Sequence, residues 1–280
     1  MNNAGDRQNP LTIIPRDQHI ISRDSISEAA LKVLYRLSKS GFRACLVGGG
    51  VRDILLNIEP KDFDIATDAT PEEIHQLFRN SRIIGRRFRL VHIRFGREII
   101  EVATFRQHSE ESPRTELNDQ GRILRDNTFG DIEDDAIRRD FTANALYYDI
   151  ANFSLLDYTQ GLADIESRIL RMIGDPVTRY QEDPVRMLRA VRFAAKLDFD
   201  IETQTSDAIL ESAHLLATIP PARLFDETIK LFHSGKASQV LPMLRHYNLL
   251  EHLIPGLNDW YQSEPDESMM DFIDQSLINT

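Results

Sequence analysis

Two acidic residues, Asp62 and Asp64, stand one residue apart at the start of a short apolar run. Side chains alternate across a β-strand, so we expect both carboxylates to point to the same face. Two carboxylates this close repel each other, and without a cation the pKa of one of them would rise. A divalent ion resolves the repulsion, because Mg²⁺ binds carboxylate oxygens and keeps room for phosphates. The pair therefore indicates a metal site that handles phosphates, with a solvated strand end as the simpler alternative.

A run of three glycines, Gly48 to Gly50, lies shortly before this pair and directly after an apolar strand at 45–47. Without a Cβ, backbone N–H groups can approach an anion closely, so the glycines favour a phosphate cradle. An ordinary turn is the alternative. A dinucleotide-binding fold is excluded by the spacing, because Asp53 stands where the last glycine of G-x-G-x-x-G would be.

A third acid, Glu101, lies on the second of two β-rich runs, 90–95 and 98–105, which Gly96 and Arg97 join as a two-residue hairpin. Alternation places Glu101 on the face of apolar residues such as Ile99. A charge among apolar neighbours is costly unless it is paired or binds a metal. We therefore expect Glu101 to bind metal or to pair with one of the nearby arginines.

Two further clusters carry arginines. Arg139 and Asp140 head an apolar segment that contains Asn144, where Asp140 could cap a helix and Arg139 could simply be solvated.

Farther along, Asp183 precedes a helix that begins after a proline. Three arginines recur every three residues on this helix and form a stripe, namely Arg186, Arg189 and Arg192. An aspartate and an arginine one turn apart offer an acceptor and a donor fork, which can pair with the edge of a base. A capped helix with a basic face is the alternative.

The composition is that of a globular protein, with 280 residues, 41% hydrophobic and 28% charged. The single cysteine, Cys45, lies in an apolar strand pattern and is expected to be a buried thiol. No apolar run is long enough to span a membrane and no secretion signal is evident, so we expect a cytoplasmic protein. The net charge of −11 is a poor match to nucleic acid, so it either argues against an RNA partner or indicates a basic surface that is local or absent from this chain.

The strings around these clusters resemble those of the class II nucleotidyltransferases, which include bacterial poly(A) polymerases and tRNA CCA-adding enzymes. The resemblance spans about residues 31–255 and rests on motifs in the family's order, namely GGGVRDILL at 48–56 with KDFDIAT at 61–67, EVATFR at 101–106, RRDFTANAL at 138–146 and EDPVRMLR at 182–189. It implies an α+β fold, with a small mixed β-sheet flanked by helices and followed by all-helical parts. We expect a flexible arm at 1–22, a catalytic head at 23–150, a base-recognising neck at 151–218 and an incomplete RNA-binding helical body at 219–280.

The resemblance also implies roles for individual residues. Asp62 and Asp64 would bind Mg²⁺, with Mn²⁺ as the alternative, and Glu101 and Asp140 would assist catalysis. The nucleotide would be held by a set of residues from both arginine clusters and the glycine turn, namely Gly49, Arg52, Arg139, Asn144, Asp183, Arg186, Arg189 and Arg192. Within that set, Asp183 and Arg186 would select the base.

The segment from Ile84 to Leu90 contains Arg86, Arg87 and Phe88 and is similar to the one found in bacterial poly(A) polymerases. This similarity favours template-independent addition of AMP from ATP to RNA 3′ ends, in mRNA processing and decay. CCA addition to tRNA is the first alternative, and a catalytically weak nucleotide- or RNA-binding relative is the second. The sequence does not indicate which RNAs are tailed or which oligomeric state the chain adopts.

Overall fold

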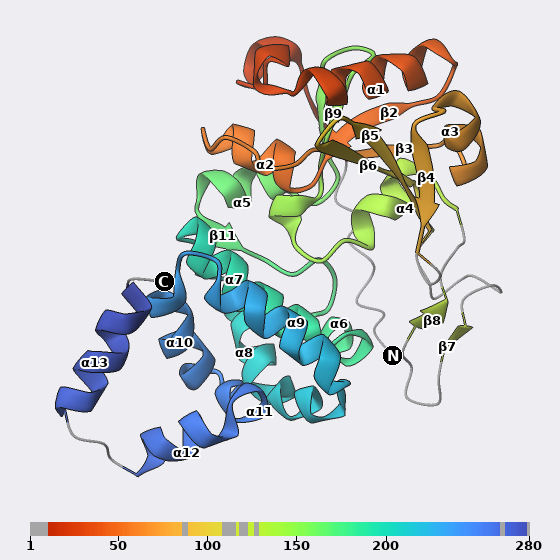
Figure 1. Cartoon of the computed structure of the whole chain (residues 1–280). Coiled ribbons are helices and arrows are strands. Elements are labelled where there is room, and N and C mark those ends of the chain that lie inside the picture. The colour runs from red at the N-terminus through yellow and green to blue at the C-terminus, as the bar shows by residue number, and fades with distance from the viewer. Residues whose placement is uncertain are drawn as a thin grey trace, which may run out of the picture. The chain divides into compact units, whose positions relative to one another are not determined.

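The computed structural model describes residues 11–85, 89–107, 116–117, 123–125, 129–263 and 267–278. The chain divides into two compact units, residues 1–167 and 168–280. Within the described residues, no helix is both long and apolar enough to cross a membrane. The α+β expectation is confirmed, because the first unit is built on a β-sheet and the second is almost entirely helical (Figure 1).

The first unit contains an eight-stranded sheet with strand order β1-β10-β9-β2-β3-β6-β5-β4. Its strands are β1 (Thr12–Ile14), β2 (Ala44–Val47), β3 (Asp64–Thr67), β4 (Ser81–Ile84), β5 (Leu90–Phe95), β6 (Glu98–Thr104), β9 (Leu146–Asp149) and β10 (Leu155–Asp157). β3 and β6 pair in parallel and the other neighbours pair antiparallel, so the sheet is mixed, as predicted. A separate two-stranded sheet joins β7 (Glu116–Leu117) and β8 (Ile123–Arg125).

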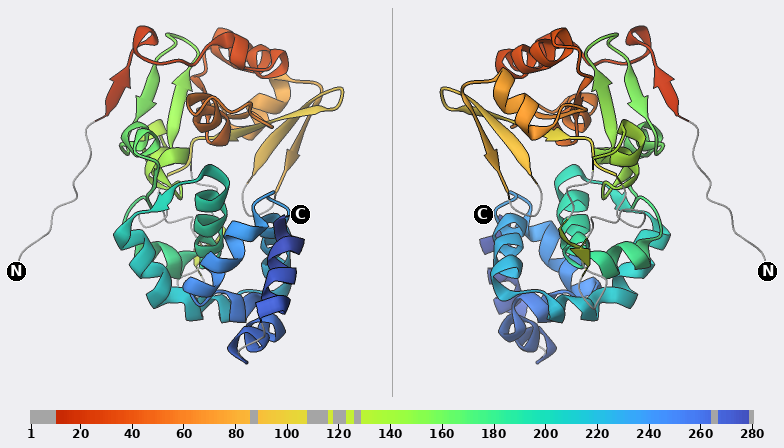
Figure 2. Two further views of the ribbon diagram at one scale, coloured as in Figure 1. Left: turned by 90° about the vertical axis from the view of Figure 1, so that its left-hand side faces the viewer. Right: turned by 90° about the vertical axis from the view of Figure 1, so that its right-hand side faces the viewer.

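The helices of the first unit cover both faces of the sheet, with α1 and α4 on opposite faces (Figures 1 and 2). They are α1 (Glu28–Lys39), α2 (Gly49–Leu55), α3 (Pro71–Leu77), α4 (Ile132–Ile137) and α5 (Gly161–Glu166), with a 3₁₀ turn, η4, at Thr142–Asn144. Ser27 caps α1 by accepting from the N–H of Ala30, and Thr70 forms a reciprocal capping box with Glu73 at α3.

The sheet extends beyond the head predicted at 23–150. Thr12, Ile13 and Ile14, which we expected in a flexible arm, pair with β10 and give the sheet an edge strand. β10 and α5 also belong to the first unit, so the boundary falls after Ser167. Short alternating stretches joined to distant partners carry little local signal, which is why β1 could not be recognised from its three residues.

The second unit consists of helices with one two-stranded parallel sheet, β11 (Ile169–Leu170) and β12 (Asp200–Ile201). Its helices are α6 (Pro176–Glu182), α7 (Val185–Leu197), α8 (Thr203–Ser212), α9 (Pro221–Phe232), α10 (Ala237–His246), α11 (Leu250–Leu253), α12 (Pro255–Gln262) and α13 (Glu267–Ile278), with a 3₁₀ segment, η5, at Ala213–Thr218. Residues 168–280 form one compact unit, so the division into neck and body at 218/219 stays a prediction.

Candidate active site

A row of paired residues crosses the sheet of the first unit. Asp64 on β3 is in register with Glu101 on β6, and Glu101 is in register with His92 on β5. In the other direction Asp64 is in register with Val47 on β2, and Val47 with Tyr147 on β9. Cross-strand partners point to the same face of a sheet. The row therefore gathers two carboxylates, a histidine and a tyrosine on one face.

Asp64 occupies the electrostatic centre of this row. Burial, followed by the negative charges of Glu101 and Asp62, raises its pKa to about 6, and Arg139 partly offsets this rise. The two predicted acids and the third carboxylate thus act on one another, as two like charges in a shared site do. A bound cation would favour the charged form of such a cluster.

Glu101 is not surrounded by apolar side chains, so that expectation was wrong. The buried face of β6 carries Ile100 and Val102, whereas Glu101 and Ile99 lie on the open face. Oε1 of Glu101 lies 3.0 Å from Nε2 of His92, so among the described residues its partner is a histidine and not an arginine. Alternation was predicted correctly, but the sequence did not show which of the two faces is covered.

The glycine turn joins β2 to α2 beside this cluster, as the strand–glycine–helix pattern predicted. Gly48 has a φ of +74°, which side-chain-bearing residues rarely adopt. A Cβ built on Gly48 would lie 3.6 Å from Oδ2 of Asp64 and 3.8 Å from Nη1 of Arg139. The backbone thereby approaches both an anionic and a cationic group, and any ligand phosphate at this turn would meet Arg139.

Arg139 is fixed by a buried hydrogen-bond network. Its Nε donates to the Tyr147 hydroxyl at 2.7 Å and its Nη2 donates to Oδ2 of Asp135 at 2.9 Å, while the Tyr147 hydroxyl donates to the same Oδ2 at 2.7 Å. Although burial opposes ionisation, Arg139 and Arg138 lower the pKa of Asp135. Burial raises the pKa of Tyr147, so the phenol stays neutral and serves as a donor. Arg139 is therefore an oriented cation rather than a freely solvated one.

The remaining predicted head residues form a second network next to the turn. Oδ1 of Asp140 accepts from the N–H of Phe141 at 2.8 Å and from Nδ2 of Asn144 at 3.3 Å. Oδ1 of Asn144 in turn accepts from Nη1 of Arg52 at 2.5 Å. Arg52 is only 3% exposed and its Nε donates to Asp53 at 2.8 Å. Arg52 thus supports Asn144 from inside the protein, and its direct contact with a triphosphate stays a prediction.

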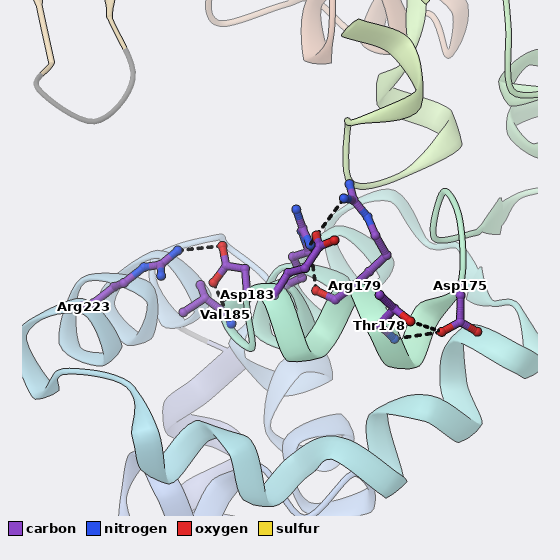
Figure 3. A network of polar contacts seen from close by, with 8 residues as sticks. Asp175, Thr178, Arg179, Asp183, Val185 and Arg223 are labelled. Atoms are coloured by element: carbon purple, nitrogen blue, oxygen red, sulfur yellow. Dashed lines mark hydrogen bonds and ion pairs between the residues drawn. The ribbon is translucent and has the colours of Figure 1, made fainter. Parts of the chain in front are cut away.

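In the second unit, Asp183 lies in the turn between α6 and α7 and has two partners. Its Oδ1 accepts from the N–H of Val185 at 3.3 Å, which matches the predicted cap, and its Oδ2 accepts from Nη2 of Arg223 on α9 at 2.8 Å (Figure 3). Arg186, the predicted partner in base selection, donates instead to Oε2 of Glu182 and to the carbonyl of Arg179, both at 2.7 Å. The two side chains are therefore held separately, each by its own partner.

The predicted arginine stripe is present on α7. Arg186, Arg189 and Arg192 are the partly exposed positions of a helix whose other residues near them are mostly buried. The guanidinium groups of Arg189 and Arg192 lie 5.3 and 4.9 Å from the ring centroid of Phe193. Nη2 of Arg192 is also 3.9 Å from Oε2 of Glu227 on α9. The stripe is thus a positively charged helix face that α9 helps to hold.

The carboxylates of the first unit fit a Mg²⁺ ion whose coordination shell is completed by substrate phosphates. Among the described residues, no three or more His, Cys, Asp or Glu side chains form a group that could by itself hold a metal ion. Mg²⁺ does not need such a cage, because it is commonly bound through one or two carboxylates together with waters and substrate phosphates. Burial and then repulsion by Glu101 and Asp62 raise the pKa of Asp64, and this cost of its charged form is the observation that favours a cation here.

Three residues of these networks were missed in the sequence, namely His92, Tyr147 and Arg223. His92 could have been found, because a two-residue hairpin pairs Phe95 with Glu98 and counting back then pairs His92 with Glu101. Arg223 lies 40 residues from Asp183, so no local pattern connects the two. Tyr147 lies only 8 residues after Arg139, but on strand β9 and beyond η4, so no helix or strand spacing links them.

Comparison with known families agrees with this geometry. Residues 44–171 match the model of the poly A polymerase head domain, and residues 198–261 match the model described as the probable RNA and SrmB-binding site of polymerase A. The computed fold resembles the crystal structure of the Bacillus stearothermophilus CCA-adding enzyme in complex with CTP, with a TM-score of 0.71 and 33% identity over 83% of this chain and 54% of that one. The fold and the matched domains are thus those of the class II nucleotidyltransferases.

Within that class, the chain belongs to the family of bacterial poly(A) polymerases and CCA-adding enzymes, as its motifs indicated. It is 55% identical to Poly(A) polymerase I of Salmonella typhi over 96% of this chain and 59% of that protein. It is 37% identical to the CCA-adding enzyme of Bacillus pumilus over 81% of this chain and 55% of that protein. The chain therefore spans less than two thirds of the length of these relatives.

Proposed function

We propose that the protein transfers AMP from ATP to the 3′ ends of RNA without a template. The in-register placement of Asp64 and Glu101, with Asp62 acting on the same carboxylate and with Arg139 beside the glycine turn that follows β2, carries this proposal. The greater similarity to poly(A) polymerases than to CCA-adding enzymes supports ATP as the nucleotide. We place the activity in the cytoplasm and in mRNA processing, and both assignments stay predictions.

The reaction joins two substrates at the carboxylate cluster. The 3′-oxygen of the RNA forms a bond to the α-phosphorus of ATP. The bond between the α-phosphorus and the oxygen that bridges to the β-phosphorus breaks, and pyrophosphate leaves. Asp62 and Asp64 would hold Mg²⁺, or Mn²⁺ in its place, and Glu101 and Asp140 would assist catalysis. When bound, the metal lowers the pKa of the attacking hydroxyl and offsets the charge of the leaving group.

The protein itself contributes mainly orientation and charge. Arg139, held by Tyr147 and Asp135, presents a fixed cation beside the glycine turn, where Gly49 leaves room for the triphosphate. Asn144 would contact the sugar, with Arg52 behind it. These roles require no movement of the arginine side chain during the reaction, because its orientation is already set.

The second unit would supply the nucleotide selection. We propose that Asp183 and Arg186 read the base and that Arg189 and Arg192 bind phosphates. The separate anchoring of Asp183 by Arg223 and of Arg186 by Glu182 supports this role, because a rigid acceptor and a rigid donor discriminate between bases better than mobile ones.

CCA addition to tRNA is the second candidate, favoured by the similarity to the CTP-bound Bacillus stearothermophilus enzyme. The segment that favoured poly(A) synthesis includes Arg86, Arg87 and Phe88, which lie outside the described residues.

Incubation of the protein with RNA and either ATP or CTP distinguishes the candidates. Long A tails on unrelated RNA 3′ ends support our proposal, whereas a single CCA on tRNA supports the alternative. Binding of ATP without incorporation, in Mg²⁺ or in Mn²⁺, would identify a nucleotide-binding relative that lacks catalysis.

A further inference from the structure

The two substrates of the proposed reaction must reach Asp64 from different directions. On the β2 side of Asp64 lie the glycine turn and Arg139, which suit the triphosphate. On the other side the same row continues through Glu101 on β6 and His92 on β5 to Arg82 on β4. The nucleotide side is thus accounted for, and the β6–β5–β4 side is left for the second substrate.

This β6–β5–β4 face is open. The alternate residues of β5 and β6 that point to the other face, such as Val91 and Val102, are buried, while Arg82 and Arg94 are exposed. Ile99 on the same open face is 44% exposed. The face therefore offers an accessible surface that begins at the catalytic carboxylates and ends at an edge strand.

Positive charge lies at the far end of this face. Arg82 has no side-chain partner among the described residues, and Arg94 donates from Nε to the carbonyl of Gly96 at 3.0 Å, which holds it at the hairpin turn. Neighbouring strands are about 4.8 Å apart, so the backbone of Arg82 lies about 14 Å from that of Asp64 along the row. Between them, Nε2 of His92 lies 3.0 Å from Oε1 of Glu101.

We propose that the open face of β4, β5 and β6 is the track along which the RNA 3′ end approaches, with Arg82 and Arg94 binding phosphates upstream of the reacting nucleotide. This inference rests on the proposed function, because it takes RNA as the second substrate. A single strand is favoured over a duplex, since the face presents isolated cations and an apolar residue rather than a groove. The local cations also explain how a chain with a net charge of −11 can hold a polyanion.

The test is a double variant, Arg82→Gln with Arg94→Gln, and a matched control, Lys32→Gln with Lys39→Gln. The control removes the same charge from α1, which packs on the opposite face of the sheet from α4 (Figure 1). All four side chains project from the surface, so the fold should be retained, and equal thermal midpoints would verify this. Affinity for a fluorescent single-stranded oligoadenylate is measured by anisotropy over a salt series, without nucleotide.

We expect the double variant to bind the oligoadenylate about tenfold more weakly, with the slope of log K against log salt smaller by about 1 to 2. The control should stay within about twofold of the unchanged protein, and ATP affinity, measured by calorimetry, should be the same in all three. Equal RNA affinity of the double variant and the control would overturn the proposal, as would an absence of RNA binding by the unchanged protein at low salt.

A parallel loss of ATP affinity would assign the arginines to the triphosphate instead and would also overturn the proposal. The proposed function and the proposed RNA track can fail separately. RNA bound through Arg82 and Arg94 but never extended would contradict the proposed function alone. Normal extension and normal RNA affinity with both arginines replaced would contradict the RNA track alone.

Discussion

At the scale of single residues, the ionised form of Asp64 is disfavoured in the folded protein when no cation is bound. Its pKa of about 6 in the folded protein exceeds the ordinary value of 3.8, first because of burial and then because of Glu101 and Asp62. The folded protein therefore binds this proton more tightly than the unfolded chain does. The contribution of Asp64 to the free energy of unfolding is thus highest below the unfolded pKa, decreases as the pH rises between the two values, and reaches its low plateau above about 6.

Replacement Asp64→Asn should therefore stabilise the metal-free protein at neutral and higher pH. A shift of about two pKa units corresponds to about 3 kcal/mol, which is the upper limit of the expected gain. Urea unfolding in a chelator, at about pH 4 and about pH 8, measures the effect, which should be small at the lower pH and largest at the higher one.

The exposed Glu59→Gln serves as the control, because it removes a carboxylate outside the cluster. Added Mn²⁺ should raise the stability of the unchanged protein more than that of Asp64→Asn. Equal stability of Asp64→Asn and the unchanged protein at both pH values would show that the ionised carboxylate of Asp64 does not destabilise the folded protein.

At the scale of elements, the site depends on a tight contact between α5 and η4. Oδ1 of Asp157 accepts from the N–H groups of Thr159 and Gly161, each at 3.0 Å, which sets the start of α5. A Cβ on Gly161 would lie 2.2 Å from the carbonyl oxygen of Thr142 in η4, the turn that also contains Asn144. These contacts show how the segment 157–164 supports the site.

Gly161→Ala should lower the free energy of unfolding by about 3 kcal/mol or more, because the added methyl group overlaps backbone atoms that cannot move aside. Chemical denaturation measures the loss. Gly256→Ala is the matched control, since nothing lies within 4 Å of the new Cβ there. A loss no larger than that of the control would mean that η4 shifts freely, and Asn144 would then not be held as described.

The contact between α9 and the turn before α7 should matter for base selection rather than for folding. Arg223→Met removes the donor to Oδ2 of Asp183 and leaves the cap to Val185 in place. We expect the preference for ATP over CTP, measured as a ratio of kcat/KM, to fall by about tenfold, the equivalent of one hydrogen bond to a charged group.

Lys236→Met, which removes a positive charge from the same unit, should leave the ratio unchanged. If Arg223→Met lowers kcat for both nucleotides equally and keeps their ratio, the residue supports the helix and not the selection.

The sequence predicted those parts of the site that are local in the chain. The strand–glycine–helix pattern around Gly48, the hairpin at Gly96 and the arginine stripe on α7 all follow from spacing over a few residues, and the structure contains them. The partners of Glu101 and Asp183 depended instead on which face was covered and on contacts across the fold. The edge strand β1 was missed for the same reason, because its partner lies more than 100 residues away in the chain.

At the scale of the whole molecule, the chain is acidic overall but carries local groups of arginines. The net charge is −11, yet the arginines that the proposed function uses lie in two groups, one at the sheet of the first unit and one on α7 of the second. Long-range attraction for RNA is therefore weak, and binding must come from close contacts whose strength decreases steeply with salt.

The most direct test of the account is extension of an RNA 3′ end with ATP and Mg²⁺ by the unchanged protein and by Asp62→Asn with Asp64→Asn. Because the two carboxylates supply the metal chemistry, the account predicts tails from the unchanged protein and at least about 1,000-fold slower AMP incorporation by the variant, with RNA affinity retained. Tailing at an undiminished rate without both carboxylates would contradict it.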